Sequence, residues 1–231
     1  LQRAYDQVIH DVALQNLPVI FCLDRAGLVG EDGATHHGVF DIAYLNCIPN
    51  LIIAAPKDEK ELRNIMYTAS EGLNYPIAFR YPRGRGDVVN WQLPFEKIEI
   101  GKLKTLQKGT QVAILSTGTI GNNVTQALEN LNLPNSIAHF DFPFVKPLDE
   151  TLLHTIFSKF ETVITIEDGV VSGGFGSAVL EFAAANNYHS KIQILGVPDE
   201  FIEQGTVLEL QQYCKIDVSS LQSFFQELLN N

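Results

Sequence analysis

The chain has 231 residues, of which 45% are hydrophobic and 19% charged, and it carries a formal net charge of −11. This excess of acidic groups argues against partners that are themselves negatively charged, such as nucleic acid or an anionic membrane. No apolar run approaches the ~20 residues that span a bilayer, no signal-peptide pattern is visible, and three scattered cysteines suit a reducing compartment, so we expect a cytoplasmic protein with buried thiols.

The first half of the chain predicts a helix, then strands and a second helix. Residues 1–13 repeat apolar side chains at helical spacing. No N-cap residue precedes them, so we expect that sequence is missing upstream and that the chain is a fragment. The run 18–23 is continuously apolar, which is typical of a strand covered on both faces. Asp58, followed by Glu61, predicts the start of a helix over 58–70. Further strands are expected at 51–55 and 77–81.

The second half continues this alternation, and two helices close the chain. Strands are expected at 112–116, 137–142, 163–166 and 192–195. The pattern predicts an α/β fold of two domains with mainly parallel sheets. We place the first domain at 1–85, a linker at 86–110 and the second domain at 111–231. Trp91 and Pro94 fall in the linker, within a mixed polar run that suggests packing on the surface.

The segment from Asp24 to Asp41 (DRAGLVGEDGATHHGVFD) is the most informative one for function. It follows the carboxyl end of a predicted strand, where open α/β sheets bind ligands. Two adjacent histidines, His36 and His37, lie within it. Successive side chains of an extended chain face opposite ways, so we expect one functional and one structural histidine. The alternative is an ordered surface loop whose glycines serve turn geometry.

All six arginines lie in the first 85 residues: Arg3, Arg25, Arg63, Arg80, Arg83 and Arg85. Arginine is the side chain best suited to bidentate recognition of phosphate or carboxylate groups. Their concentration favours an anionic ligand for this half, and the alternative is that they are surface charges that aid solubility.

Several motifs occur in an order that is known from one enzyme family. They are DRAG-x-x-G-x-DG-x-THHG-x-x-D, IPN, AP-x-DE-x-EL, RYPRG, DFPFVKPLDE, EDGVVSGGFG and LGVPDEFIEQG. Together they resemble 1-deoxy-D-xylulose-5-phosphate synthases, which are thiamine-diphosphate enzymes of the transketolase type. The resemblance covers essentially the whole chain, as a transketolase-like pyrimidine-binding domain, N-terminally truncated, and a transketolase C-terminal domain.

The resemblance implies a transferase activity for the full-length protein. Pyruvate would condense with D-glyceraldehyde 3-phosphate to give 1-deoxy-D-xylulose 5-phosphate and CO₂, the first step of the non-mevalonate isoprenoid pathway. The product would also feed the synthesis of thiamine and pyridoxal, and the enzyme would be a homodimer. Thiamine diphosphate and Mg²⁺ are the implied cofactors. The chain has no GDG motif followed by a metal-ligating asparagine. We therefore expect no metal ligand in this chain, and no activity from the fragment alone.

The resemblance also implies roles for individual residues. Arg25 and Arg83 match the arginines that grip the phosphate of glyceraldehyde 3-phosphate. Arg3 matches a residue beside the aminopyrimidine of the cofactor and the substrate. His36 matches an active-site histidine suited to proton transfer, and Asp32 matches an acid in the polar network around the substrate.

Other polar or glycine-rich positions receive structural interpretations. His37 is assigned to structure, and Arg63 to a solvated surface charge. The pair Glu167–Asp168 is interpreted as a strand-end cap. The run 173–176 is expected to allow close helix packing rather than to bind an anion, and 118–121 to form a tight turn rather than a dinucleotide site.

Two other functions remain open on sequence grounds. The β subunit of a 2-oxoacid dehydrogenase joins the same two domains, but a lipoyl acceptor does not require the arginine pair. A non-catalytic nucleotide-binding or interaction module could be built on the second α/β unit, although the glycine pattern for a dinucleotide is incomplete.

Overall fold

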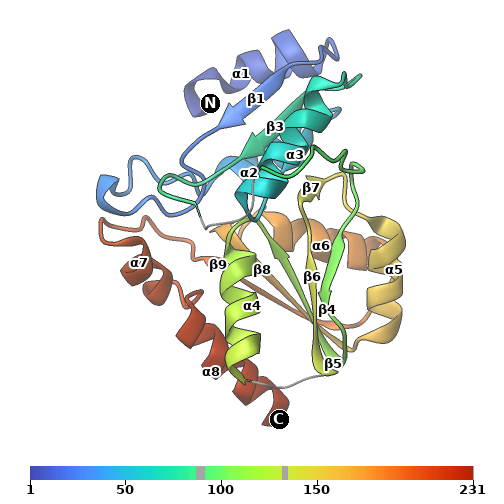
Figure 1. The fold of residues 1–231 in the computed structure, drawn as a ribbon, viewed down its shortest axis with the longest axis vertical. Coiled ribbons are helices and arrows are strands. Elements are labelled where there is room, and N and C mark those ends of the chain that lie inside the picture. The colour runs from blue at the N-terminus through green and yellow to red at the C-terminus, as the bar shows by residue number, and fades with distance from the viewer. Residues whose placement is uncertain (87–91, 132–134, 231) are drawn as a thin grey trace.

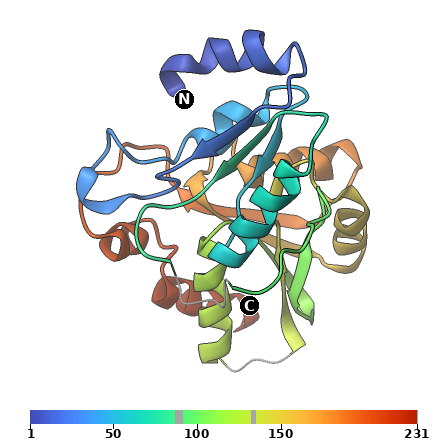
Figure 2. The same ribbon diagram turned by 45° about the horizontal axis from the view of Figure 1, so that its top comes forward.

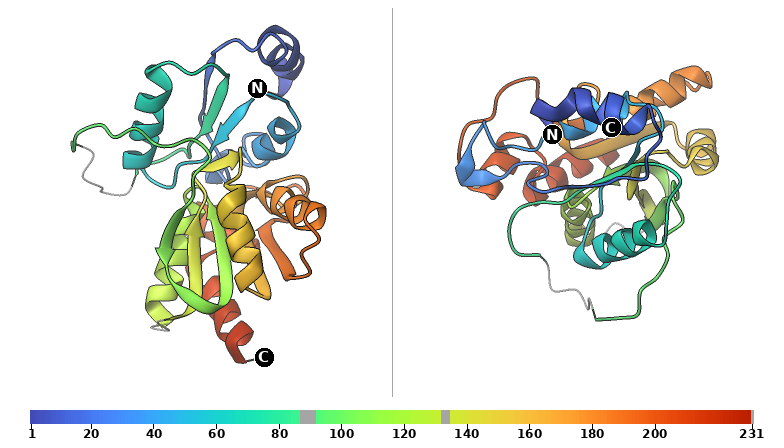
Figure 3. Two further views of the ribbon diagram at one scale, coloured as in Figure 1. Left: turned by 90° about the vertical axis from the view of Figure 1, so that its right-hand side faces the viewer. Right: turned by 90° about the horizontal axis from the view of Figure 1, so that it is seen from above.

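The computed structural model describes residues 1–86, 92–131 and 135–230, and the chain forms two sheets, one above the other in Figure 1. The upper sheet has four strands in the order β1-β3-β2-β7, and the lower sheet has five in the order β4-β6-β5-β8-β9. The expected α/β fold with two mainly parallel sheets is confirmed. The helical segment at the N-terminus lies at one end of the molecule and the C-terminal helix at the other (Figures 1 and 3).

The first sheet is mostly parallel. Its strands are β1 (Ile20–Leu23), β2 (Ile52–Ala54), β3 (Ile77–Arg80) and β7 (Phe144–Lys146). Strands β1 and β2 both run parallel to β3, and β7 runs antiparallel to β2. Because β7 comes from the second half of the sequence, the two halves share this sheet.

Strand β1 differs from its expected burial. The prediction that it is covered on both faces is wrong, because Ile20 and Cys22 are exposed while Phe21 and Leu23 pack towards the core. The reason is its position at the edge of the sheet. The apolar cluster on helix α3 (Glu59–Ser70) contains residues of β2 and β3 but none of β1.

The helices of the first half match their expected positions. Residues 2–13 are helical, as the 3-10 turn Gln2–Ala4, α1 (Tyr5–Gln7) and a π-helical stretch Val8–Ala13. Helix α2 (Asp41–Asn46) was not predicted. Helix α3 begins as expected, with the Asp58 carboxylate accepting a hydrogen bond of 2.8 Å from the backbone N–H of Glu61.

Arg63 on α3 is not the solvated surface charge that was predicted. Its guanidinium carbon lies 3.9 Å from the centre of the Phe95 ring, and the side chain is half-buried. A guanidinium group stacks readily on an aromatic face, which the helical pattern around Arg63 alone could not show.

The second sheet has helices on both of its faces. Its strands are β4 (Lys104–Gln107), β5 (Gly109–Thr117), β6 (Asn135–Asp141), β8 (Thr162–Val170) and β9 (Lys191–Val197). The helices of this half are α4 (Ile120–Leu131), α5 (Glu150–Lys159), α6 (Phe175–Ala185), α7 (Val207–Tyr213) and α8 (Val218–Asn230). Strand β4 is antiparallel to β6, and the remaining neighbours are parallel.

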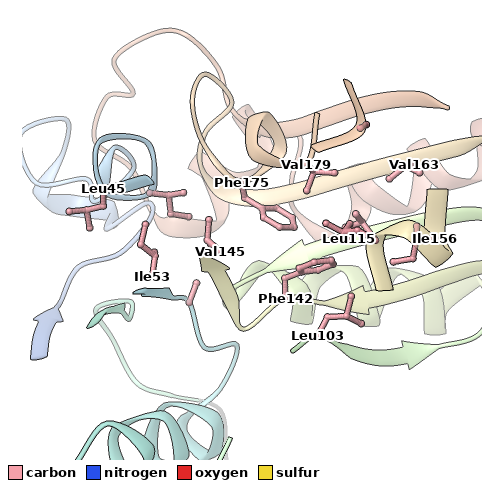
Figure 4. Close-up of a cluster of buried hydrophobic side chains, with 14 of the residues drawn as sticks. Leu45, Ile53, Leu103, Leu115, Phe142, Val145, Ile156, Val163, Phe175 and Val179 are labelled. Atoms are coloured by element: carbon pink, nitrogen blue, oxygen red, sulfur yellow. The ribbon is translucent and has the colours of Figure 1, made fainter. Parts of the chain in front are cut away.

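Side chains 112–117 of β5 are all buried, and successive ones pack on opposite faces, as expected for a sheet with both faces covered. Val112 and Ile114 pack in one cluster with residues of α4 and α8, and Ala113 and Leu115 pack in another with residues of α5 and α6. This second cluster continues into the first sheet through Ile53 (Figure 4). One hydrophobic core therefore joins the two sheets.

Two sequence expectations concern the linker and the cysteines. Within the expected linker, β4 pairs with β6, and Trp91 lies outside the described residues. The expectation of buried thiols is wrong for Cys22 and Cys47, which are exposed.

The tight turn expected at 118–121 is present, since Gly118 has a φ of +76° and its carbonyl accepts a 3.0 Å hydrogen bond from the N–H of Gly121. Among the helices of the described part, none has the length and apolar character needed to cross a bilayer.

Candidate functional site

The residues expected to bind phosphate lie at the carboxyl ends of two neighbouring strands. Arg25 follows β1 and Arg83 follows β3, and these strands are paired in parallel. One carboxylate oxygen of Asp32 lies 3.4 Å from Nη1 of Arg25 and forms an ion pair with Nη1 of Arg83. The structure therefore brings two guanidinium groups to one anionic oxygen, near solvent, as a site for a phosphate dianion requires.

A cavity of about 650 Å³ lies next to this cluster. Its lining includes Arg3 from the N-terminal helical segment together with Arg25 and His36. Nδ1 of the exposed His36 lies 2.9 Å from the hydroxyl of Thr35. Three of the five predicted site residues thus share one cavity. Phe21 and other residues of β1 also line it.

Arg83 and Asp32 are not among the residues that line this cavity. Arg83 borders a separate hollow of about 460 Å³, between the segment that follows β3 and the start of α4. Lys57, Arg85 and Thr119 also border it. Asp32 contacts both arginines and so connects the cavity and the hollow.

His37, which was assigned to structure, is buried, and it borders the same cavity as His36. Its Nδ1 accepts a 3.1 Å hydrogen bond from the backbone N–H of Val29, so its proton is on Nε2. Nε2 lies 3.3 Å from the carbonyl oxygen of Glu203, in the segment before α7. This segment and the loop after β1 run side by side in two views (Figures 1 and 2). His37 therefore connects the loop to the second half of the chain.

Arg80, at the end of β3, was given no role by the sequence analysis, although the quoted motif RYPRG contains it. Its side chain is only 5% exposed. Its Nε donates a 2.8 Å hydrogen bond to Asp41, and its Nη2 donates to the carbonyl oxygens of Gly38 (2.9 Å) and Asp168 (3.0 Å). A buried guanidinium needs an acidic partner, and Asp41 is that partner here.

Glu167 caps the helix that follows its strand. The interpretation as a strand-end cap is corrected, because its two carboxylate oxygens accept hydrogen bonds from the backbone N–H groups of Phe175 (2.9 Å) and Gly176 (2.8 Å), at the start of α6. An anionic ligand is not needed there. A Cβ atom at Gly176 would lie 2.5 Å from the side chain of Ile194, so the glycine allows close helix packing, as expected.

The stability of the protein should depend on the protonation of Glu167. Burial raises the pKa of this carboxyl from 4.5 to about 7, although the two backbone N–H groups oppose the change. The native state then holds the proton more tightly than the unfolded chain. Its contribution is therefore complete below about pH 4.5 and is lost as the pH rises through about 7, a difference of about 3 kcal/mol.

The Glu167→Gln variant tests this prediction, because its amide stays neutral at every pH. Urea unfolding of both proteins at pH 5 and pH 8 should show that the wild type loses more stability than the variant between these values. Parallel losses in the two proteins would show that Glu167 is ionised throughout, as its two N–H donors favour.

Comparison with known protein families gives two adjacent matches. Residues 1–87 match the pyrimidine-binding domain of transketolase, and residues 101–221 match the transketolase C-terminal domain. Together the two matched stretches cover most of the chain.

Individual proteins agree with these matches. The chain is 55% identical to a 1-deoxy-D-xylulose-5-phosphate synthase of Parabacteroides distasonis and 56% identical to one of Cytophaga hutchinsonii. Each match covers 96% of this chain but 35% of the relative, so the chain spans about a third of their length.

Solved structures show the same fold. One is described as "Split gene transketolase, inactive beta4 tetramer", with a TM-score of 0.82 and 25% identity over 99% of this chain and 72% of its own. The transketolase of Campylobacter jejuni matches with a TM-score of 0.70 and 18% identity, over 98% of this chain and 33% of its own.

Proposed function

Because this chain belongs to the transketolase family, through its pyrimidine-binding and C-terminal domains, we propose that it is the acceptor-binding part of a 1-deoxy-D-xylulose-5-phosphate synthase. The complete enzyme condenses pyruvate with D-glyceraldehyde 3-phosphate, releases CO₂ and begins the non-mevalonate isoprenoid pathway in the cytoplasm. The observation that carries this proposal is the meeting of Arg25 and Arg83 at one oxygen of Asp32.

The three charged residues have complementary roles in this proposal. Arg25 and Arg83 bind the phosphate of the acceptor, and each guanidinium can offer a pair of N–H groups to its oxygens. Asp32 keeps the two like-charged groups together before the substrate arrives, and afterwards belongs to the polar network around the sugar. His36, exposed in the adjoining cavity, exchanges a proton with the substrate oxygens.

The cavity fits one end of thiamine diphosphate. Its walls combine the apolar side chains of Phe21 and Leu23 with Arg3, which suits a flat aminopyrimidine ring. The cofactor, when bound, supplies the reactive carbon for decarboxylation and carbon–carbon bond formation. For the diphosphate and Mg²⁺, the described residues offer no group of three His, Cys, Asp or Glu side chains. As the family resemblance implies, we propose that the region the longer relatives have in addition holds that end of the cofactor.

The proposal extends to the activity and the assembly of the chain. We propose that the chain is inactive alone and that the complete enzyme is a homodimer. The related split-gene transketolase, described as an inactive β4 tetramer, supports both inactivity and self-association of such a chain.

The names of the relatives and the paired arginines favour the proposed function over that of the β subunit of a 2-oxoacid dehydrogenase. The tight turn at Gly118 weakens the case for a nucleotide-binding module.

The test of the proposed function is a product assay on the complete enzyme. Pyruvate and D-glyceraldehyde 3-phosphate should give 1-deoxy-D-xylulose 5-phosphate with one CO₂ for each product formed. Transfer of the two-carbon unit to a lipoyl acceptor, with no condensation product, would instead identify a dehydrogenase subunit.

The affinity of the isolated chain for thiamine diphosphate should be weak. Calorimetry with Mg²⁺ present should detect binding no tighter than millimolar, because the chain contacts the aminopyrimidine alone. Micromolar binding that requires Mg²⁺, equivalent to about 8 kcal/mol, would show that this chain holds the diphosphate site itself.

A further inference from the structure

The loop that carries the candidate site, residues 25–38, is fixed by a buried network of three charged residues, of which Asp41 borders the cavity and the other two do not. We call Arg80, Asp41 and Asp168 the Arg80 network. Arg80 forms an ion pair of 2.8 Å with Asp41 and donates hydrogen bonds to the carbonyl oxygens of Gly38 and Asp168. Asp41 and Gly38 follow β1, and Asp168 lies on β8 of the second sheet. One guanidinium group therefore ties the loop to both sheets.

The two ends of the loop are coupled to each other. The backbones of Gly27 and Gly38 exchange two hydrogen bonds of 2.9 Å. A Cβ atom at Gly38 would lie 2.0 Å from the carbonyl oxygen of Arg25, so these backbones are in direct contact. Arg25 itself has a φ of +61°, a conformation that non-glycine residues seldom adopt without support. A shift of Gly38 must therefore move Arg25.

The second half of the chain adds a contact of its own. Asp168 accepts a 3.3 Å hydrogen bond from the N–H of Leu28 through Oδ1. A Cβ atom at Gly27 would lie 1.8 Å from its Oδ2, so the carboxylate packs against the backbone of the loop. Asp168 and Arg80 do not border the cavity of Arg25 and His36 within the described structure. They contact the loop at its backbone.

We propose that Arg80 and Asp168 are positioning residues for the acceptor phosphate, and that the C-terminal half of the chain contributes to substrate recognition through them. This inference rests on the proposed function, in which Arg25 binds the phosphate. The network holds the loop backbone so that Arg25 and Arg83 reach the same anion. Loosening the network separates the two guanidinium groups, and leaves the binding of pyruvate unchanged.

The decisive variant is Arg80→Lys in the complete enzyme. Lysine keeps a charge beside Asp41 but lacks the planar fork that also spans two carbonyl oxygens. The KM for D-glyceraldehyde 3-phosphate should rise about tenfold, since small displacements of binding groups have large kinetic effects. The KM for unphosphorylated D-glyceraldehyde should stay within about twofold of the wild type, because this aldehyde has no phosphate for the two guanidinium groups to bind.

A second variant tests the C-terminal half separately. Asp168→Ala removes the carboxylate but keeps the carbonyl that accepts from Arg80. Hydrogen exchange should become about tenfold faster at the amide of Leu28, because its N–H has lost its partner, and faster also at Gly27, whose backbone loses the packing of the same carboxylate. This measurement needs no activity and remains informative if Arg80→Lys folds poorly.

The matched control is Lys104→Met. Lys104 lies on β4 of the second sheet and forms an ion pair with the buried Glu61 of α3, so it also connects the two halves. The Lys104→Met variant should be less stable than the wild type. Its KM for the phosphorylated acceptor and the hydrogen-exchange rates of its loop amides should be unchanged.

Three results would overturn the positioning role. They are an equal change in KM for both aldehydes in Arg80→Lys, unchanged amide exchange in Asp168→Ala, or the same KM pattern in Lys104→Met. Failure of the proposed function is distinguishable, because Arg25→Ala would then keep the wild-type preference between the two aldehydes, in an enzyme whose loop exchange still depends on Asp168.

Discussion

Arg25→Ala and Arg83→Ala should each lower kcat/KM for D-glyceraldehyde 3-phosphate by about 10- to 200-fold, because each removes a charge-assisted contact worth roughly 1.5–3 kcal/mol. Both side chains reach one oxygen of Asp32 at neighbouring strand ends, so both can contact one phosphate. The remote phosphate contributes binding energy that orients the aldehyde for attack. Steady-state kinetics with the phosphorylated and unphosphorylated aldehydes measures this contribution directly.

The donor half of the reaction provides an internal comparison. Pyruvate has no phosphate, so its decarboxylation should be nearly unchanged in both variants. Lysine at either position should restore part of the loss, since it keeps the charge but not the fork. Arg63→Ala is the matched control, because this arginine lies on α3 over the Phe95 ring and should leave the kinetics of both aldehydes unaltered.

The opposite pattern would reject the phosphate clamp. If both alanine variants lose pyruvate decarboxylation in proportion to condensation, the arginines belong to the donor site or support the fold. If only one variant loses kcat/KM selectively for the phosphorylated aldehyde, Asp32 pairs with the other arginine for a structural reason. If that other arginine is Arg83, the hollow beside it lies outside the acceptor site.

Local sequence patterns predicted most elements of the fold because their signals are short-range. The cap at Asp58 and the alternation of buried runs depend on neighbours within a few positions. The exposure of β1 depends instead on strand order, which places it at an edge beyond the cover of α3. Strand β7 joins a sheet whose other strands end at residue 80, and a pairing over that separation leaves little local trace.

The candidate site divides in the same way. The loop and its charged residues could be selected from composition and family resemblance, and the structure brings Arg25, Asp32 and Arg83 together. The role of Arg80 could not be selected, because one of its acceptors, Asp168, lies 88 positions away on another sheet. Burial and long-range partners distinguish Arg80 from the exposed Arg83, and neither property is visible in the motif RYPRG.

Asp41→Ala should reduce the free energy of unfolding by about 3–5 kcal/mol, because it leaves the Arg80 guanidinium buried without its carboxylate. The two side chains are 9% and 5% exposed and 2.8 Å apart, so water cannot readily replace the lost partner. Asp41 also accepts a 2.8 Å hydrogen bond from the N–H of Ile42, which adds to the cost. Urea unfolding at constant pH gives the difference between the variant and the wild type.

An exposed ion pair of the same chemistry serves as the control for Asp41→Ala. Lys97 and Glu71 are 3.1 Å apart but 62% and 43% exposed, so Lys97→Ala should cost less than about 1 kcal/mol. The double variant Asp41→Leu with Arg80→Met removes both charges and should recover part of the loss. Recovery stays incomplete because the carbonyl of Asp168 loses its donor. If Asp41→Ala costs no more than Lys97→Ala, solvent reaches Arg80, and the junction between the two sheets is looser than its contacts indicate.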